Sequence, residues 1–130
     1  MAETALADLH DLHSNPGSGL HIAALAGAWT VAVVGFGGMR DHGGRLTFAP
    51  RLPAALRLSF RLLFQGRCLL VDITPVEATY HLLEGDALPT AHHGEELTVA
   101  AGAPVTGPIP AAPTAEPVTQ PASRGPGRRR

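Results

Sequence analysis

The sequence contains no lysine and only one cysteine, and aromatic residues make up 5% of its 130 positions. The single cysteine, Cys68, excludes an intramolecular disulfide and is typical of a reducing compartment, so we expect a cytoplasmic location. The longest apolar run, residues 22–36, is shorter than the ~20 residues that a bilayer span needs. The start of the chain carries acidic residues and lacks the basic and apolar blocks of a signal peptide. We therefore expect neither membrane association nor export.

Positive charge is scarce in the part of the chain that can fold. Residues 1–100 hold ten acidic residues against six arginines, and the other four arginines lie in residues 124–130. Nucleic-acid binding needs basic side chains clustered on a folded surface with aromatic residues among them. We therefore expect no nucleic-acid partner, and we interpret the terminal arginines as solvated.

Two segments have compositions that differ from the rest. Residues 101–130 hold seven of the twelve prolines and no aromatic residue, so we predict a disordered tail. Residues 20–34 are predicted to form a helix that Ser18 caps. This helix is apolar on every face, which requires neighbours on all sides in a folded protein. A chain this short has no element to surround it, so we expect self-association through the exposed helix.

Alternation of apolar and polar residues with period two begins after the helix. Segments 56–64 and 67–74 have this pattern and are joined by Gln65–Gly66, which predicts a β-hairpin. Shorter strands are expected at 46–48, 78–83, 89–91 and 97–100. About six strands indicate a mainly β chain, a small antiparallel β-sandwich preceded by one or two helices.

Few residues have the spacing of a metal or catalytic site. Asp8, His10, Asp11 and His13 are suitable ligand types, but they lie across a helix end and a loop, so we interpret them as solvated. The pair His92–His93 is expected in a hairpin turn. We therefore expect no metal ion.

A glycine-rich segment, residues 17–21, leads into the N-terminus of the predicted helix. Free backbone amides, the Ser18 hydroxyl and the helix dipole can bind an anion there. An ordinary serine N-cap gives the same sequence and, on the residues alone, is the more common explanation.

The segment SGLHIAALAGAWTVAVVGFGGMRDHGGRLTFAPRLP, residues 18–53, resembles the C-terminal part of glycoside hydrolase family 65. This family contains disaccharide phosphorylases and hydrolases that act on α-glucosides such as maltose, trehalose and kojibiose. The resemblance covers about residues 8–100 and includes the Gly35–His42 signature. It implies that residues 1–38 are the end of an (α/α)6 barrel catalytic domain, that 39–100 form a C-terminal β-sandwich domain, and that 101–130 are a tail.

The resemblance also implies a phosphate-binding site in this chain and the absence of the catalytic residue. The loop before the last barrel helix helps to bind inorganic phosphate in phosphorylases of this family, which assigns phosphate binding to Ser18, Gly19 and His21. Pro16 and Gly17 depart from the threonine and polar residue usual there. The catalytic general acid lies upstream in the barrel and has no counterpart here, so the resemblance implies no catalytic residue and an inactive chain.

We expect phosphorolysis rather than hydrolysis in a complete enzyme, since no Asp or Glu occurs between Leu12 and Arg40 to activate water. The disaccharide and phosphate would be partners only of that complete enzyme, with phosphate as co-substrate and no cofactor. The alternative is a free-standing β-sandwich that binds carbohydrate or another protein. It ranks second because Phe48, Phe60, Phe64 and Tyr80 are expected in the core, which leaves no aromatic platform to display.

Overall fold

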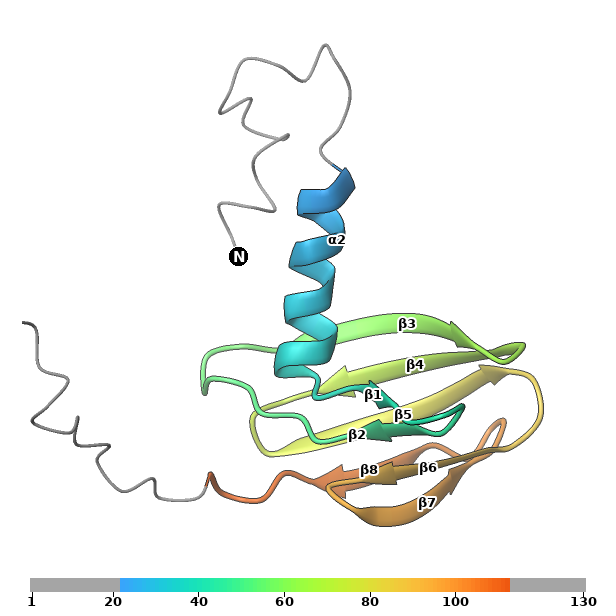
Figure 1. Cartoon of the computed structure of the whole chain (residues 1–130). Helices are drawn as coiled ribbons and strands as arrows, with labels where there is room; N and C mark the ends of the chain where they lie inside the picture. Colours follow the sequence, from blue (N-terminus) through green and yellow to red (C-terminus); the bar gives the residue numbers. More distant parts are fainter. Residues whose placement is uncertain (1–21, 113–130) are drawn as a thin grey trace, which may run out of the picture.

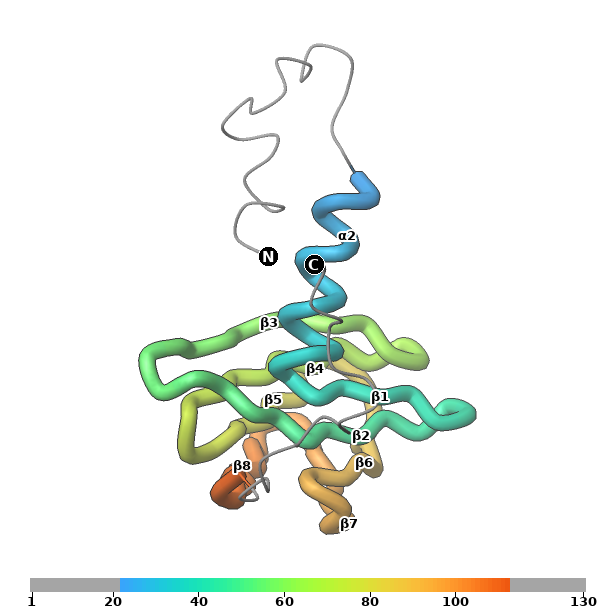
Figure 2. The backbone as a smooth tube through the Cα atoms, turned by 60° about the vertical axis from the view of Figure 1, so that its left-hand side comes forward, coloured from blue at the N-terminus to red at the C-terminus, as the bar shows by residue number. Residues whose placement is uncertain are grey.

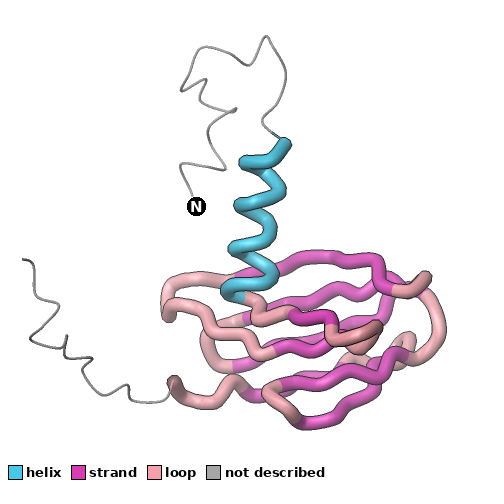
Figure 3. Tube along the Cα trace, in the orientation of Figure 1, coloured by secondary structure: helices cyan, strands magenta, loops and turns pink. Residues whose placement is uncertain are grey.

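A computed structural model describes residues 22–112 of the chain. These residues form one helical segment followed by eight strands (Figures 1 and 3). The α-helix α2 spans Ile22–Thr30 and continues into a π-helical turn, η2, at Val31–Phe36. The strands are β1 Arg40–Asp41, β2 Leu46–Phe48, β3 Leu58–Phe64, β4 Arg67–Ile73, β5 Glu77–Glu84, β6 Leu88–His92, β7 Glu95–Val99 and β8 Val105–Pro108.

The strands form two four-stranded sheets, with strand orders β1-β2-β6-β7 and β3-β4-β5-β8. The predicted hairpin is present, with Phe64 paired to Arg67 around the Gln65–Gly66 turn. The mainly β sandwich fold is therefore confirmed. One pair differs from the expected antiparallel arrangement, because β2 runs parallel to β6. A parallel pair needs a long crossover connection, and here the strands β3 to β5 of the other sheet supply it.

The core lies between the two sheets and is built by the period-two pattern of each strand. Inward-facing residues of β2 and β6 pack against inward-facing residues of β4 and β5, and Phe48 and Tyr80 meet with ring centroids 5.0 Å apart. Phe60 is also buried, whereas Phe64 is half-buried against the core. The aromatic residues that the sequence places in the core therefore do lie there.

The helical segment ends later than the predicted Val34. Thr30 donates its hydroxyl hydrogen to the carbonyl oxygen of Ala26, 2.8 Å away. The N–H of Gly37 then bonds to the carbonyl oxygen of Ala32 at 2.9 Å, five residues back. A wider turn of this kind adds residues to a helix end, so the segment extends to Phe36. The predicted start at Leu20 lies outside the described residues.

Strand β8 corrects the predicted disordered tail. Val105–Pro108 pairs with β5 along four residue pairs and completes the edge of its sheet. The prediction of disorder is wrong for this part, because an edge strand tolerates proline and the open edge of β5 offers unpaired backbone groups. Residues 113–130 lie outside the described part of the chain.

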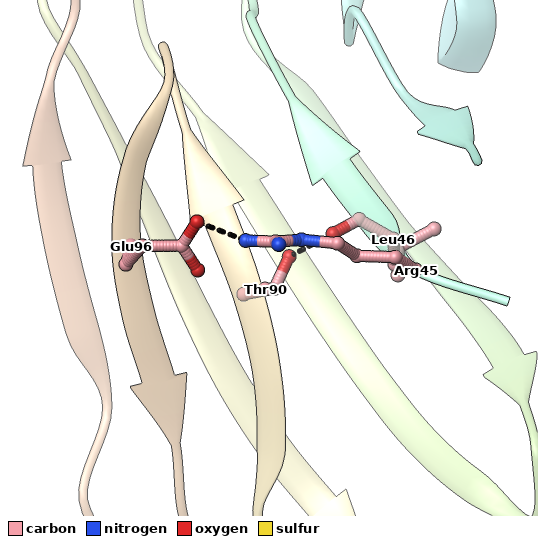
Figure 4. Close-up of polar contacts among 4 residues, drawn as sticks. All are labelled: Arg45, Leu46, Thr90 and Glu96. Carbon is pink, nitrogen blue, oxygen red and sulfur yellow. Dashed lines mark hydrogen bonds and ion pairs between the residues drawn. The ribbon is translucent and has the colours of Figure 1, made fainter. Parts of the chain in front are cut away.

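Polar contacts fasten β2, β6 and β7 to one another (Figure 4). The buried hydroxyl of Thr90 on β6 donates to the carbonyl oxygen of Leu46 at 2.7 Å. On the surface, Arg45 forms an ion pair with Glu96 on β7. Within residues 22–112, every buried side-chain nitrogen and oxygen has a hydrogen-bond partner. The buried polar side chains of the sandwich are therefore all paired within the described residues.

Candidate functional site

The three residues assigned to phosphate binding, Ser18, Gly19 and His21, lie outside the described residues 22–112. The acidic and histidine cluster at residues 8–13 lies outside them as well. The phosphate-binding assignment therefore stays a prediction. The pair His92–His93 is inside, with His92 ending β6 and His93 beginning the turn to β7.

The helix α2 has no neighbour among the described residues along most of its length. Figures 1 and 2 show from two directions that it projects from the sandwich and meets it only at the η2 end. Ile22 is 74% exposed and Trp29 is 47% exposed, whereas Val33 of η2 is 1% exposed. Leu25 and Val31 are exposed too. The apolar faces of the helix therefore form a surface that the sandwich does not cover.

A pocket of about 570 Å³ lies where η2 meets the sheet of β2 and β6. We call it the junction pocket, and its principal lining residues are Gly38, Arg40, His42, Thr47, Arg51 and His93. They come from the loop after η2, from β1 and the turn that follows it, from β2, and from the segments that follow β2 and β6. Residues far apart in sequence are therefore assembled at the end of the helix.

Backbone contacts fix the wall of this pocket. Gly38 has φ +61°, and a Cβ atom there would lie 2.2 Å from the carbonyl oxygen of Ala49. The N–H of Ala49 in turn bonds to the carbonyl oxygen of Gly38 at 3.1 Å. The N–H of Arg51 bonds to the carbonyl oxygen of Phe36 at 2.9 Å. Because only glycine permits this approach, the segment after β2 lies directly against the chain leaving η2.

Two guanidinium groups give the junction pocket its charge. Arg40 Nη1 donates to the carbonyl oxygens of Val34 and Met39, at 2.6 and 2.7 Å. Arg51 Nη1 donates to the carbonyl oxygen of Pro110 at 2.9 Å. Neither arginine has a carboxylate partner among residues 22–112, and none of the described lining residues is acidic. The pocket is therefore electropositive.

His93 contributes a hydrogen-bonding group to the junction pocket rather than a positive charge. Burial lowers its pKa, the neighbouring His92 and Arg51 lower it further, and its hydrogen bond to Pro50 opposes them. Its Nε2–H donates to the carbonyl oxygen of Pro50 at 3.2 Å, since a carbonyl can only accept. His93 also has φ +48°, a conformation suited to the tight turn before Gly94. The positive charge of the pocket therefore comes mainly from Arg40 and Arg51.

The described lining of the junction pocket includes two imidazoles, those of His42 and His93, and no carboxylate. Among the described residues, no three His, Cys, Asp or Glu side chains converge as metal ligands. Arg40 and Arg51 were not singled out from the sequence, because they are eleven residues apart on separate segments. The two arginines come to line one pocket only because the backbone at Gly38 lies against the backbone at Ala49 in the folded chain.

Comparison with known proteins identifies the sandwich. Residues 39–99 match the model of glycosyl hydrolase family 65, C-terminal domain. A solved structure provisionally assigned as a kojibiose phosphorylase from the human microbiome superposes with a TM-score of 0.70 at 21% identity, over 82% of this chain and 15% of that chain. The two proteins therefore share the fold.

Sequence relatives agree with this assignment. A glycosyl hydrolase of Mycobacterium leprae, uncharacterised in its reaction, is 46% identical over 129 residues, covering 97% of this chain and 16% of its own length. An α,α-trehalose phosphorylase of Thermoanaerobacter brockii is 37% identical over 100 residues, covering 76% of this chain and 13% of its own length. Other relatives are kojibiose and maltose phosphorylases.

The chain thus spans about a sixth of the length of the mycobacterial relative that it matches. Within residues 22–112, no helix has the length and apolarity that crossing a membrane requires. The free-standing carbohydrate-binding module is set aside, because the family match and the buried aromatic residues both favour the other interpretation. The chain belongs to glycoside hydrolase family 65, of which residues 39–99 carry the C-terminal domain.

Proposed function

We propose that this chain acts as the C-terminal domain of a cytoplasmic α-glucoside disaccharide phosphorylase, which uses inorganic phosphate as co-substrate. The observation that carries the proposal is the apolar helix α2 attached to a family 65 C-terminal domain. Trehalose, kojibiose and maltose phosphorylases among the relatives support phosphorolysis as the reaction. The barrel, the disaccharide and the general acid belong to the complete enzyme.

The helix explains how such a domain would connect to the rest of an enzyme. Burying a large apolar side chain stabilises a protein by about 1.5–3 kcal/mol, and α2 leaves several of these side chains in water. Trp29 and Ile22 both lie on α2, and both side chains are exposed. We infer that they pack against neighbouring helices of a catalytic barrel.

A chimeric enzyme tests this function directly. The aligned C-terminal segment of the Thermoanaerobacter brockii trehalose phosphorylase is replaced by the matching residues of this chain. We expect phosphorolysis of trehalose to glucose and glucose 1-phosphate to be retained. Trp29→Gln in the chimera is expected to reduce both activity and melting temperature, because it removes an apolar contact with the barrel.

The matched control is Leu63→Gln, which changes a leucine that is 81% exposed on β3. It is expected to leave the activity of the chimera unchanged, since Leu63 belongs to the sandwich and not to the helix that is proposed to meet the barrel. A folded chimera without activity would contradict the proposal. Equal losses in the two variants would contradict the role of the helix.

The chain by itself is proposed to be inactive on trehalose, kojibiose and maltose. General acid catalysis alone typically supplies about 10²–10⁴-fold, and the resemblance to family 65 assigns the general acid to the upstream barrel. Phosphate binding by Ser18, Gly19 and His21 would then matter only beside the barrel. Release of glucose 1-phosphate by the purified chain, abolished by a substitution within it, would contradict this expectation.

Without a barrel, the exposed helix is proposed to drive self-association. Sedimentation velocity of the full chain is expected to show concentration-dependent oligomers, and Trp29→Gln is expected to shift them towards monomer. Leu63→Gln serves again as the control and should leave the distribution unchanged. A monomeric wild-type chain at all concentrations would contradict the proposal.

A further inference from the structure

We propose that the junction pocket binds a phosphate group, either as inorganic phosphate or at the end of a small phosphate monoester. This inference concerns residues 35–94 and does not depend on the proposed function. Neither Ser18, Gly19 nor His21 takes part in it. It starts from the unbalanced charge of Arg40 and Arg51.

The lining of the junction pocket sets Arg40 and Arg51 apart from the other described arginines. Arg45 and Arg67 share a second pocket, but that pocket also holds the carboxylate of Glu96, with which Arg45 pairs. Arg40 and Arg51 donate to backbone carbonyl oxygens, as Arg67 also does, and none of the described residues that line their pocket is acidic. An anion bound in this pocket would offset the two guanidinium charges, which no carboxylate of the described lining balances.

Hydrogen-bond donors remain available on both side chains. A guanidinium group carries five N–H donors, and the contacts within residues 22–112 engage only Nη1 of each arginine. The remaining nitrogens can form the paired hydrogen bonds that guanidinium groups make to phosphate. A carboxylate has two oxygens, whereas a phosphate offers three or four, so two arginines match a phosphate better.

Strand pairing adds a hydroxyl group beside Arg40. Arg40 and Thr47 are directly opposite each other in the β1–β2 pair, so their side chains lie on the same face of the sheet. Leu46 and Phe48, on either side of Thr47, are buried in the core. Thr47 therefore points outward, into the pocket that Arg40 also lines.

The carbonyl end of the helical segment repels an anion, but this repulsion is weaker than the attraction of the two arginines. Its carbonyl groups carry roughly half an elementary negative charge, and Arg40 Nη1 already bonds to one of them at Val34. Two full positive charges outweigh that half charge. The volume of about 570 Å³ lies within the ~300–1,000 Å³ of small-molecule sites, which leaves room for a monoester as well as for free phosphate.

The test is a titration of the ¹⁵N-labelled full chain, with inorganic phosphate and glycerol 3-phosphate as separate probes at constant ionic strength. Amide shifts are followed by NMR at Arg40, Thr47 and Gly94. We expect saturable shifts at these amides. A lower dissociation constant for glycerol 3-phosphate than for inorganic phosphate would identify a monoester as the ligand. A lower dissociation constant for inorganic phosphate would identify the free ion.

Variants separate binding from fold maintenance. Arg40→Gln and Arg51→Gln keep a donor for the backbone carbonyl oxygens but remove the charge, and each is expected to weaken binding about tenfold, or about 1.4 kcal/mol. The matched control is Arg61→Gln, an exposed arginine on β3 outside the pocket, which should leave the affinity unchanged. Thr47→Val, suited to a strand, is expected to weaken binding without disturbing the spectrum elsewhere.

Three results would overturn the proposal. The first is the absence of saturable shifts with both probes in the wild-type chain, which needs no variant to be folded. The second is a set of shifts confined to residues 17–21, which would place phosphate at the helix start alone. The third is an equal loss of affinity in Arg61→Gln, which would indicate attraction to net charge and not to a site.

Discussion

The hydroxyl oxygen of Tyr80 lies 2.7 Å from Nδ1 of His92, and the contact joins the two sheets of the sandwich. The other ring nitrogen of His92, Nε2, lies 2.9 Å from the carbonyl oxygen of Pro108 on β8. Because a carbonyl only accepts, Nε2 carries the hydrogen, and in the neutral ring Nδ1 accepts from the Tyr80 hydroxyl. One buried imidazole therefore connects β5, β6 and β8.

Replacing Tyr80 by Phe should destabilise the fold. The substitution keeps the ring that packs on Phe48 but leaves Nδ1 of His92 buried without a partner, which costs about 1–3 kcal/mol. Urea unfolding would measure the loss. Thr79→Val is the control, because it removes the Thr79–Thr106 hydroxyl contact at the exposed side of the same strand and should cost less. Equal losses in the two variants would contradict the role of the buried contact.

Gly38→Ala should be more damaging than Gly43→Ala. Both glycines have a positive φ, +61° and +63°, so an alanine at either position costs about 1–2 kcal/mol of backbone strain. Only at Gly38 does the added Cβ also collide with a backbone oxygen, that of Ala49, whereas Gly43 has open space. Thermal unfolding of the two variants compares them. Similar melting temperatures would show that the close approach of Gly38 to Ala49 contributes little.

The pH dependence of stability should include a contribution from His93. Its pKa in the folded chain lies below the ordinary 6.5, chiefly because of burial. The unfolded chain therefore binds this proton more readily, and the free energy of unfolding falls as pH decreases from about 6.5 through the lower folded pKa. His93→Asn removes the titration and tolerates the positive φ. Its stability should decline less steeply below pH 6.5 in denaturant titrations, and a steeper decline would contradict this sign.

Two truncations should behave differently. A chain ending at Ala112 is expected to keep the wild-type melting temperature, because residues 113–130 have a composition that buries little apolar surface. A chain ending at Ala103 loses β8, its pairing with β5 and the carbonyl partner of His92, so its melting temperature should fall by several degrees. A stable chain without β8 would restore the prediction that residues 101–130 are dispensable.

Much of the fold could be predicted because its signals are local. Alternating residues at 56–64 and 67–74 and the Gln65–Gly66 turn fix a hairpin by the geometry of neighbouring residues alone. Strand β8 was missed because its glycine and proline also suit a disordered tail. Gly107 is in fact required there, since an added Cβ would lie 2.5 Å from the ring of His92.

For the candidate site too, local sequence signals could be predicted and tertiary contacts could not. The sequence by itself determined the family resemblance and the apolar character of the helix, because both depend on residue types along the chain. Only the tertiary structure decided that Arg40 and Arg51 share a pocket and that His92 joins three strands. These contacts depend on which strands become neighbours. The burial of apolar faces across the whole sandwich determines the strand neighbours, and no local sequence pattern predicts them.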